Sequence, residues 1–291
     1  MLNKFFQHVL DVYINKKNKR FYFIYFSILK YFAKSKLILN FKNFKFYAST
    51  SKKDLSRWMV RNLVQWDKKN IKIIIKLMKK YNSTFVDCGC NYGAYTIPIA
   101  TKFKDDIIYS LDASNLAINS LKENINLNNL KNIRYFNLGV GEKNEIKYFD
   151  DNIKNYNNTG SYRFVKNKTK KKIKLYKLDY LFENKIIKLK KNVIIKIDIE
   201  GYDFFALKGM IKTLKKFNVI IFFEFSKLLI KNSKYFEKDF LSFSKKNQLN
   251  LYDLNFKKKS IQELLFLLNA TSKNDETIGD FIISNWNFKK K

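Results

Sequence analysis

Two short segments carry side chains whose types and spacing suit the binding of a nucleoside. The first, TFVDCGCNYGAYT at residues 84–96, predicts a buried strand reaching Asp87, a turn with Gly89 and Gly93, and then a helix. The spacing D-x-G-x-x-x-G differs from the G-x-G-x-x-G of dinucleotide sites, and no phosphate-loop motif occurs. A carboxylate beside the turn suits a ligand with a cationic centre and free hydroxyls. S-adenosylmethionine (SAM) has both.

A second acidic residue, Asp112, ends the next apolar run, IIYSLD, about 20 residues beyond the glycine turn. In doubly wound folds an acid at this place accepts hydrogen bonds from ribose hydroxyls. Taken separately, the glycines are compatible with an ordinary turn, and Asp112 with a cap for the helix that begins near Ser114. Together, in this order and spacing, they favour a nucleoside site.

The second segment, IIKIDIEGYDFFALKG at residues 194–209, brings another acid to a strand tip. Its apolar residues predict a buried strand that delivers Asp198, and Glu200 and Gly201 then open a helix with Asp203 in its first turn. Helix capping explains one of the two acids Glu200 and Asp203. For Asp198 we favour a role in the site.

The elements that position these residues alternate between strand and helix from residue 84 onward, which predicts an α/β fold with a mostly parallel sheet and helices on both faces. Ligands bind such sheets at the carboxyl ends of the strands, so Asp87, Asp112, Asp198 and Glu224 are expected along one rim. The glycines at 139 and 141 predict a turn. Strands are expected at 84–88, 107–112, 133–138, 145–149, 173–177, 192–198, 218–225, 249–254 and 278–284, and helices at 68–80, 93–103, 114–128, 179–184, 202–216, 233–246 and 260–268.

At this point the chain resembles a known family. FVDCGCNYGAYT is similar to the first motif of FkbM-type SAM-dependent methyltransferases, and KIDIEGYDFFALKG to their K-I-D-x-E-G-x-E-x-x-x-L-x-G segment. The pairs Leu178-Asp179 and Phe223-Glu224 also match, and the resemblance covers about residues 66–285. It implies a Rossmann-like class I methyltransferase fold. It also implies methyl transfer from SAM to a hydroxyl, often on a sugar or another small glycosylated or polyketide product. Departures from the pattern are Cys90, Asp112 and Asp203.

The resemblance also implies roles for residues. Asn91 and the glycine amides would contact the methionine part, Asp112 the ribose, and the segment after the third strand the adenine. The hydroxyl needs a base, and the only histidine, His8, is far away in sequence. A carboxylate must serve, with Asp198 first and Glu200 or Glu224 as competitors, and no metal-ligand spacing is evident. The expected cofactor-binding residues are Asp87, Gly89, Asn91, Gly93, Asp112, Ala113, Ser114, Gly139 and Val140.

The net charge of +33, from 58 basic and 25 acidic residues, leaves a second interpretation open. It reflects either compositional drift or a polyanionic partner. A nucleic-acid (RNA) methyltransferase would use residues 166–174 to follow phosphates and Tyr162 and Phe164 to stack on bases. Against this, the N-P-P-Y tetrad of amino-methylating enzymes is absent, since the strand end reads IDIE.

Residues 1–65 are expected to form a basic, aromatic, helical extension ahead of a methyltransferase domain at 66–291. Residues 1–35 either dock on a membrane or a partner or pack on the following domain. The apolar run at 21–33 is too short to span a bilayer. A third interpretation is a membrane-binding or partner-binding protein with a decayed methyltransferase fold. Cys88 and Cys90 read as reduced thiols, which favours a cytoplasmic protein, with peripheral contact at the inner membrane face as an alternative.

Overall fold

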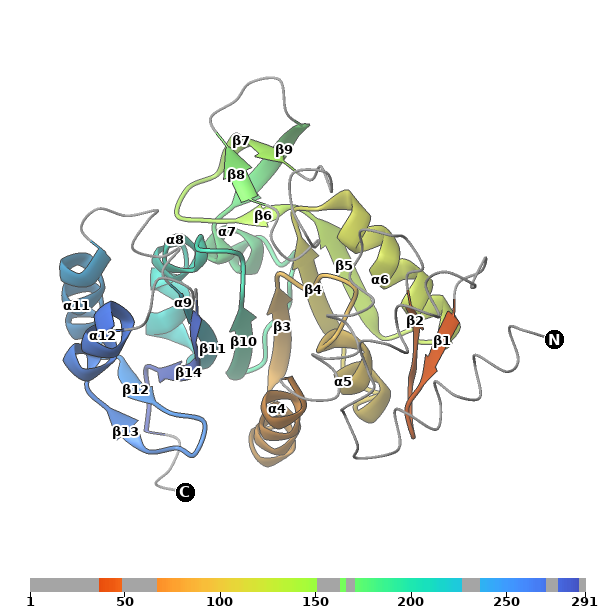
Figure 1. The fold of residues 1–291 in the computed structure, drawn as a ribbon, viewed down its shortest axis with the longest axis horizontal. Helices are drawn as coiled ribbons and strands as arrows, with labels where there is room; N and C mark the ends of the chain where they lie inside the picture. Colours follow the sequence, from red (N-terminus) through yellow and green to blue (C-terminus); the bar gives the residue numbers. More distant parts are fainter. Residues whose placement is uncertain are drawn as a thin grey trace.

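The fold is built on an eight-stranded sheet with the order β13-β12-β14-β11-β10-β3-β4-β5 (Figure 1). The computed structural model describes residues 37–48, 67–150, 163–165, 171–226, 236–270 and 277–287. From β11 to β5 all neighbours pair in parallel, whereas β14 is antiparallel to both β11 and β12. The strands are β3 (Thr84–Cys88), β4 (Ile108–Asp112), β5 (Ile133–Asn137), β10 (Asn192–Ile197), β11 (Asn218–Ser226), β12 (Asn250–Tyr252), β13 (Lys258–Lys259) and β14 (Thr277–Ser284).

The direction of chain progression reverses between β3 and β10. From β3 the chain moves outward through β4 to β5, and from β10 it moves the other way to β11. In open α/β sheets the crevice at such a reversal is where ligands bind. The two sequence motifs therefore end on adjacent strands at this point, and the expected mostly parallel α/β sheet is confirmed.

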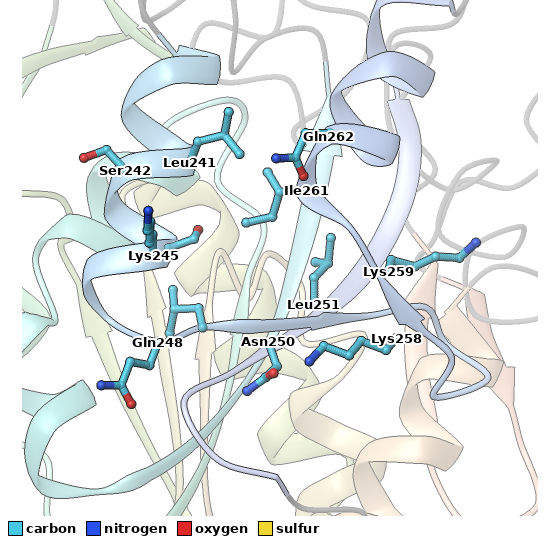
Figure 2. A pocket seen from close by; sticks show the side chains of 12 residues that line it. Leu241, Ser242, Lys245, Gln248, Asn250, Leu251, Lys258, Lys259, Ile261 and Gln262 are labelled. Carbon is cyan, nitrogen blue, oxygen red and sulfur yellow. The ribbon is translucent and has the colours of Figure 1, made fainter.

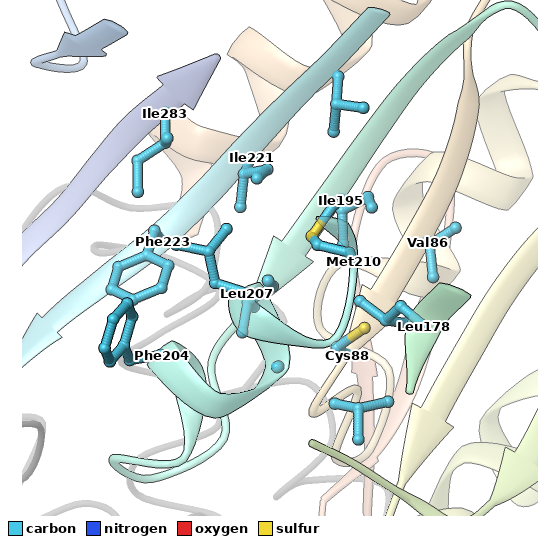
Figure 3. Packing of buried hydrophobic residues seen from close by; sticks show 14 of the residues in the cluster. Val86, Cys88, Leu178, Ile195, Phe204, Leu207, Met210, Ile221, Phe223 and Ile283 are labelled. Atoms are coloured by element: carbon cyan, nitrogen blue, oxygen red, sulfur yellow. The ribbon is translucent and has the colours of Figure 1, made fainter. Parts of the chain in front are cut away.

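Helices cover both faces of the sheet, as expected. Successive strand residues alternate between two apolar clusters: Phe85 joins one, and Val86 and Cys88 join the other. Figure 3 shows the second cluster, where Leu207 and Met210 pack against Ile195 and Ile221. One face is covered by α4 (Asp67–Tyr81), α5 (Thr96–Lys102) and α6 (Asn115–Leu127), and the other by α7 (Leu178–Glu183), α8 (Asp203–Lys208), α9 (Ile211–Lys216), α11 (Phe236–Lys246) and α12 (Ile261–Ala270).

One expected helix is divided. The apolar pattern predicted a single helix over 202–216, but α8 ends before Gly209 and α9 begins at Ile211. A Cβ at Gly209 would lie 2.1 Å from the carbonyl oxygen of Gly141, so the chain passes another backbone there at a distance that only glycine allows. The carboxylate of Asp179 then accepts hydrogen bonds from the amides of Lys212 (2.9 Å) and Thr213 (2.8 Å) and starts α9 afresh.

A second, four-stranded sheet has the order β6-β9-β7-β8 and stands above the central sheet in Figure 1. The turn expected at Gly139 is instead the short strand β6, because its backbone pairs with Leu175 and Tyr176 of β9. Phe149, Ile173 and Leu175 pack against Ala113 and Tyr202, which follow β4 and β10. This sheet therefore covers the carboxyl ends of the central strands. Its strands are β6 (Gly139–Val140), β7 (Glu145–Asp150), β8 (Arg163–Val165) and β9 (Lys171–Tyr176).

The described part of the N-terminal region is a hairpin of β1 (Leu37–Asn40) and β2 (Lys45–Ala48), not a helix. Phe46 is fully buried and lies edge-on to the ring of Tyr92. The β2 amides of Lys45 and Tyr47 donate to the side chains of Asn128 (2.7 Å) and Asn124 (2.8 Å) on α6. The rest of the expected helical extension, including 1–35, lies outside the described residues. None of the helices within the described ranges is long and apolar enough to cross a bilayer.

Candidate functional site

The glycine turn after β3 is fixed by the two neighbouring strands. The amides of Gly89 and Cys90 donate to the carbonyl of Leu111 (2.8 and 3.1 Å), and the Asp198 amide donates to the carbonyl of Cys88 (3.1 Å). Gly89 has a φ of +84°, and a Cβ there would lie 1.9 Å from the Asp198 carbonyl oxygen. Only glycine fits at this position because the backbone of Asp198 lies so close, whereas the sequence had suggested that a ligand approaches there.

Asp112 joins the glycine turn to the start of α6. Its Oδ2 accepts from the amide of Asn91 (2.9 Å), and its Oδ1 accepts from the amide of Ser114 (2.8 Å). Burial raises the pKa of Asp112 to about 6, although these two hydrogen bonds oppose the shift. The helix cap is Ser114, whose Oγ accepts from the amide of Ala117 (3.3 Å). Asp112 therefore joins the two segments, and Ser114 rather than Asp112 supplies the side-chain cap of α6.

Asp87 lies beneath the turn rather than at the surface of the rim. Its side chain is fully buried, and its Oδ2 accepts from the hydroxyl of Thr96 (2.7 Å), which also contacts the hydroxyl of Ser110 (2.8 Å). Burial raises the pKa of Asp87, and the positive charge of Lys196 opposes this. From this position Asp87 holds β3, β4 and the start of α5 together. Helix α5 begins at Thr96, three residues later than expected, because Gly93 has a φ of +95°.

Asp198 is the central charge of the site. Its side chain is 37% exposed, and one oxygen lies 2.8 Å from the ammonium of Lys196. Lys196 is itself buried, and its ammonium lies 4.6 Å from the centre of the Tyr95 ring. Burial is the main cause that raises the pKa values of five other carboxyl groups, and repulsion from Asp198 adds to each shift: those of Asp87, Asp112, Asp203, Glu224 and Asp280.

The turn after Asp198 is held from below by Asp203. This buried carboxylate accepts from the amides of Ile199 (3.0 Å) and Gly201 (2.9 Å), so it is the capping acid of the pair considered above. Burial raises the pKa of Asp203 to about 7, with repulsion from Asp198 adding to the shift. Glu200 is half-buried and has a φ of +56°, a left-handed conformation that costs energy outside glycine.

Glu224 faces Asp280 across the antiparallel pair of β11 and β14, where the two residues are register partners. Burial is the main cause that raises the pKa of Glu224 well above its usual range and that of Asp280 to about 6. The side-chain amide of Asn70 donates both to Asp280 and to the hydroxyl of Tyr95 (3.1 Å). The expected acids Asp198 and Glu224 thus share one end of the sheet with groups that sequence reasoning missed.

Signals for some of the missed residues were present in the sequence. Lys196 interrupts the apolar strand VIIKI, and Asp280 interrupts IGDFII; a charged residue inside a buried strand requires a partner. Asn70 gave no signal, because its place on α4 says nothing of what it faces. Tyr95 read only as part of the first motif.

The remaining expected residues line the second sheet. Gly139 and Val140 are buried in β6, and half-buried Ala113 packs against the same sheet. Tyr202 extends this contact, since its hydroxyl hydrogen-bonds the ammonium of Lys147 on β7. Of the loop considered for nucleic acid, Tyr162 and residues 166–170 lie outside the described residues. Within the described ranges, no group of three or more His, Cys, Asp or Glu side chains is placed to hold a metal ion.

Comparison with known proteins identifies one family. The methyltransferase FkbM domain matches residues 87–252, which is more than half of the chain. No curated protein sequence matches significantly.

Several solved structures are similar at low identity. Methyltransferase FkbM from Methylobacillus flagellatus KT is 15% identical with a TM-score of 0.39, and the match covers 69% of this chain but only 43% of that one. TYW2 from M. jannaschii, solved in complex with AdoMet, is 17% identical with a TM-score of 0.39, covering 87% of this chain and 85% of that one. Trm5b from Pyrococcus abyssi is 10% identical with a TM-score of 0.38, covering 86% and 55%.

Proposed function

Because the chain belongs to the FkbM methyltransferase domain family, we propose that it binds SAM and transfers its methyl group to a hydroxyl of a sugar or another small glycosylated or natural-product acceptor. The observation that carries this proposal is electrostatic. In a chain with a net charge of +33, Asp87, Asp112 and Asp198 lie at the ends of β3, β4 and β10, at and beside the reversal point of the sheet. A cationic sulfonium with a hydroxylated ribose suits such a site.

The residues present fit SAM, whose sulfonium supplies an activated methyl group when bound. Asp112 would accept the ribose hydroxyls, since its carboxylate already joins the glycine turn to the start of α6 at the end of β4. Asn91 and the amides of Gly89 and Gly93 would contact the methionine part. Asp87 would keep this turn in place from beneath through Thr96. Ala113, Ser114, Gly139 and Val140 would form the wall beside the adenine.

Asp198 is our candidate for the base that removes the proton from the acceptor hydroxyl. Its side chain is 37% exposed, so an acceptor can reach it, and one of its oxygens is held by the ammonium of Lys196 (2.8 Å). Glu224 is less suited, because burial raises its pKa well above the usual range and so disfavours its ionised form. Glu200 remains a competitor with a strained backbone in the same turn. Most of the rate enhancement would come from holding donor and acceptor in line.

The test is methyl transfer from radiolabelled SAM to a panel of mono- and disaccharide acceptors, with a structured RNA as a separate arm. We expect label in a sugar, and a loss of transfer in Asp198→Asn that persists at saturating SAM. Glu200→Gln and Glu224→Gln are compared in parallel. If only the RNA is labelled, the acceptor is a nucleic acid and not a sugar hydroxyl. Absence of SAM binding by the folded chain would overturn the proposal altogether.

A further inference from the structure

A hollow of about 480 Å³ lies apart from the proposed methyl-transfer site (Figure 2). It is bounded by the second half of α11, by β12 and β13, and by the first turn of α12. In the sheet, β12 is two strands from β11, which carries Glu224, and three strands from β10, which leads to Asp198, or about 10 and 14 Å. Leu241, Leu251 and Ile261 form the apolar part of its lining. The volume falls in the range of small-molecule sites, about 300–1,000 Å³.

The polar part of the lining is positively charged. Lys245, Lys258 and Lys259 contribute to it, and Lys259 is neutralised by an ion pair with Glu263 (2.8 Å). Neither Lys245 nor Lys258 forms an ion pair with a carboxylate in the part of the chain that the structure describes. Figure 2 shows the Lys258 side chain extending back toward Asn250, whereas that of Lys259 points away. Two positive charges therefore remain at the hollow.

A buried hydroxyl also lines this hollow. Ser244 is 2% exposed, and its Oγ has no hydrogen-bond partner among the described residues. Its backbone is committed to ending α11, where its carbonyl accepts from the Leu249 amide (2.9 Å). Leaving a buried hydroxyl without a partner is unfavourable, and an oxygen atom of a ligand would supply that partner.

We propose that the hollow is a second binding site, for a small phosphate monoester that carries hydroxyl groups, such as a sugar phosphate. Lys245 and Lys258 would bind the phosphate, since two ammonium groups match its double charge better than the single charge of a carboxylate. The Ser244 hydroxyl would donate to one of its oxygens. The side-chain amides of Asn250 and Gln262 would hydrogen-bond the hydroxyls, and the apolar lining would contact the ring. This site does not depend on the proposed methyl transfer.

The experiment is a calorimetric titration of the full chain with glucose 1-phosphate, inorganic phosphate and glucose. We expect saturable binding of glucose 1-phosphate, weaker binding of inorganic phosphate and none of glucose. The double variant Lys245→Met/Lys258→Met should bind glucose 1-phosphate at least tenfold more weakly. The matched control Lys72→Met/Lys79→Met removes the same charge from the exposed side of α4 and should leave the affinity unchanged.

Three results would overturn the proposal. An equal loss in both double variants would mean that diffuse surface charge holds the anion, and equal affinity for glucose would remove the role of the phosphate. The third is an unchanged affinity in the Lys245/Lys258 variant, with folding confirmed by thermal unfolding. If that variant fails to fold, Ser244→Ala keeps the question decidable, because the smaller side chain removes only the unpaired hydroxyl. Its affinity should fall severalfold, and no change would count against the site.

Discussion

Replacing Asp112 by Asn separates cofactor binding from stability. At neutral pH the wild-type chain carries the cost of burying an ionised carboxylate, and the rise of its pKa from 3.8 to about 6 corresponds to at most about 3 kcal/mol. Asn removes that cost, but one of the amides of Asn91 and Ser114 then faces the side-chain NH2 group and lacks an acceptor, which costs about 1–3 kcal/mol. These two terms nearly cancel, so the free energy of unfolding should change by no more than about 1–2 kcal/mol.

SAM affinity has no such compensation. The Asn side chain keeps one acceptor oxygen for the ribose and presents a donor where the second was, so a charged hydrogen bond of about 1.5–3 kcal/mol is lost. Calorimetric titration should therefore show SAM binding weakened by about 10- to 100-fold in Asp112→Asn. In the wild-type chain protons compete with the ribose for Asp112. The dissociation constant should be level above about pH 7 and rise by up to tenfold per unit below about pH 6. The variant should lose this dependence.

A matched control tests whether the effect belongs to the site. Asp179, like half-buried Asp112, accepts hydrogen bonds from two backbone amides, but it is buried and lies between α7 and α9. Asp179→Asn should lower stability without changing SAM affinity. Wild-type affinity in Asp112→Asn, or an equal loss in Asp179→Asn, would refute the assignment of Asp112 to the ribose.

Further predictions concern the backbone and the buried charges. Gly89→Ala should lower the free energy of urea unfolding by more than about 3 kcal/mol, because the added Cβ would collide with the carbonyl oxygen of Asp198. The control Gly279→Ala should cost only about 1–2 kcal/mol, because Gly279 also has a positive φ but has open space around it. Equal losses in the two variants would show that the collision with Asp198 is not the cause. Lys196→Met should raise the pKa of Asp87, because in the wild-type chain the ammonium of Lys196 lowers that pKa. Carbon-13 NMR titration measures this change. An unchanged pKa of Asp87 would show that Lys196 has no influence on it. Asp203 has a pKa of about 7 in the folded state, above its usual 3.8, so between these pH values the folded state binds a proton that the unfolded state does not. The free energy of unfolding that Asp203 contributes therefore falls as the pH rises from about 4 to 7. Asp203→Asn should remove that slope from urea midpoints measured between pH 5 and 8, and a slope that persists would assign it to other carboxyls.

Much of the fold was readable from the sequence because its strands are short apolar runs that end in acids. The alternation of Phe85 with Val86 and Cys88 between two faces follows directly from a buried parallel strand. The predictions that failed concerned short segments whose conformation depends on residues far away in sequence. Gly209 is a weak helix former and was a local sign of the break within 202–216, but the reason for a glycine there is the carbonyl of Gly141, far away in sequence. The pairing of Gly139 with β9 was equally non-local.

The same distinction applies to the site. Asp112 and Asp198 were predictable, because strand ends in a parallel sheet converge on one edge. The sequence could not predict which of these acids are buried, because the burial of Asp87 depends on its contact with Thr96 and on that of Thr96 with Ser110. The sequence also could not predict the hydrogen bond from Asn70 to Asp280, because these residues are 210 positions apart. Contacts of that kind are set by how α4 and β14 pack, and no local pattern encodes them.

The two asparagines that hold the hairpin act as a substitute strand. Asn124 and Asn128 are one helical turn apart, a rise of about 6.0 Å, and the amides of Lys45 and Tyr47 recur along β2 at about 6.8 Å. The near-match lets side chains of a helix pair with alternate backbone groups of an edge strand, and Asn128 also donates to the Lys45 carbonyl (2.7 Å). An edge paired in this way is closed to strand addition from a second molecule, so in this chain, rich in phenylalanine and isoleucine, α6 also protects against aggregation.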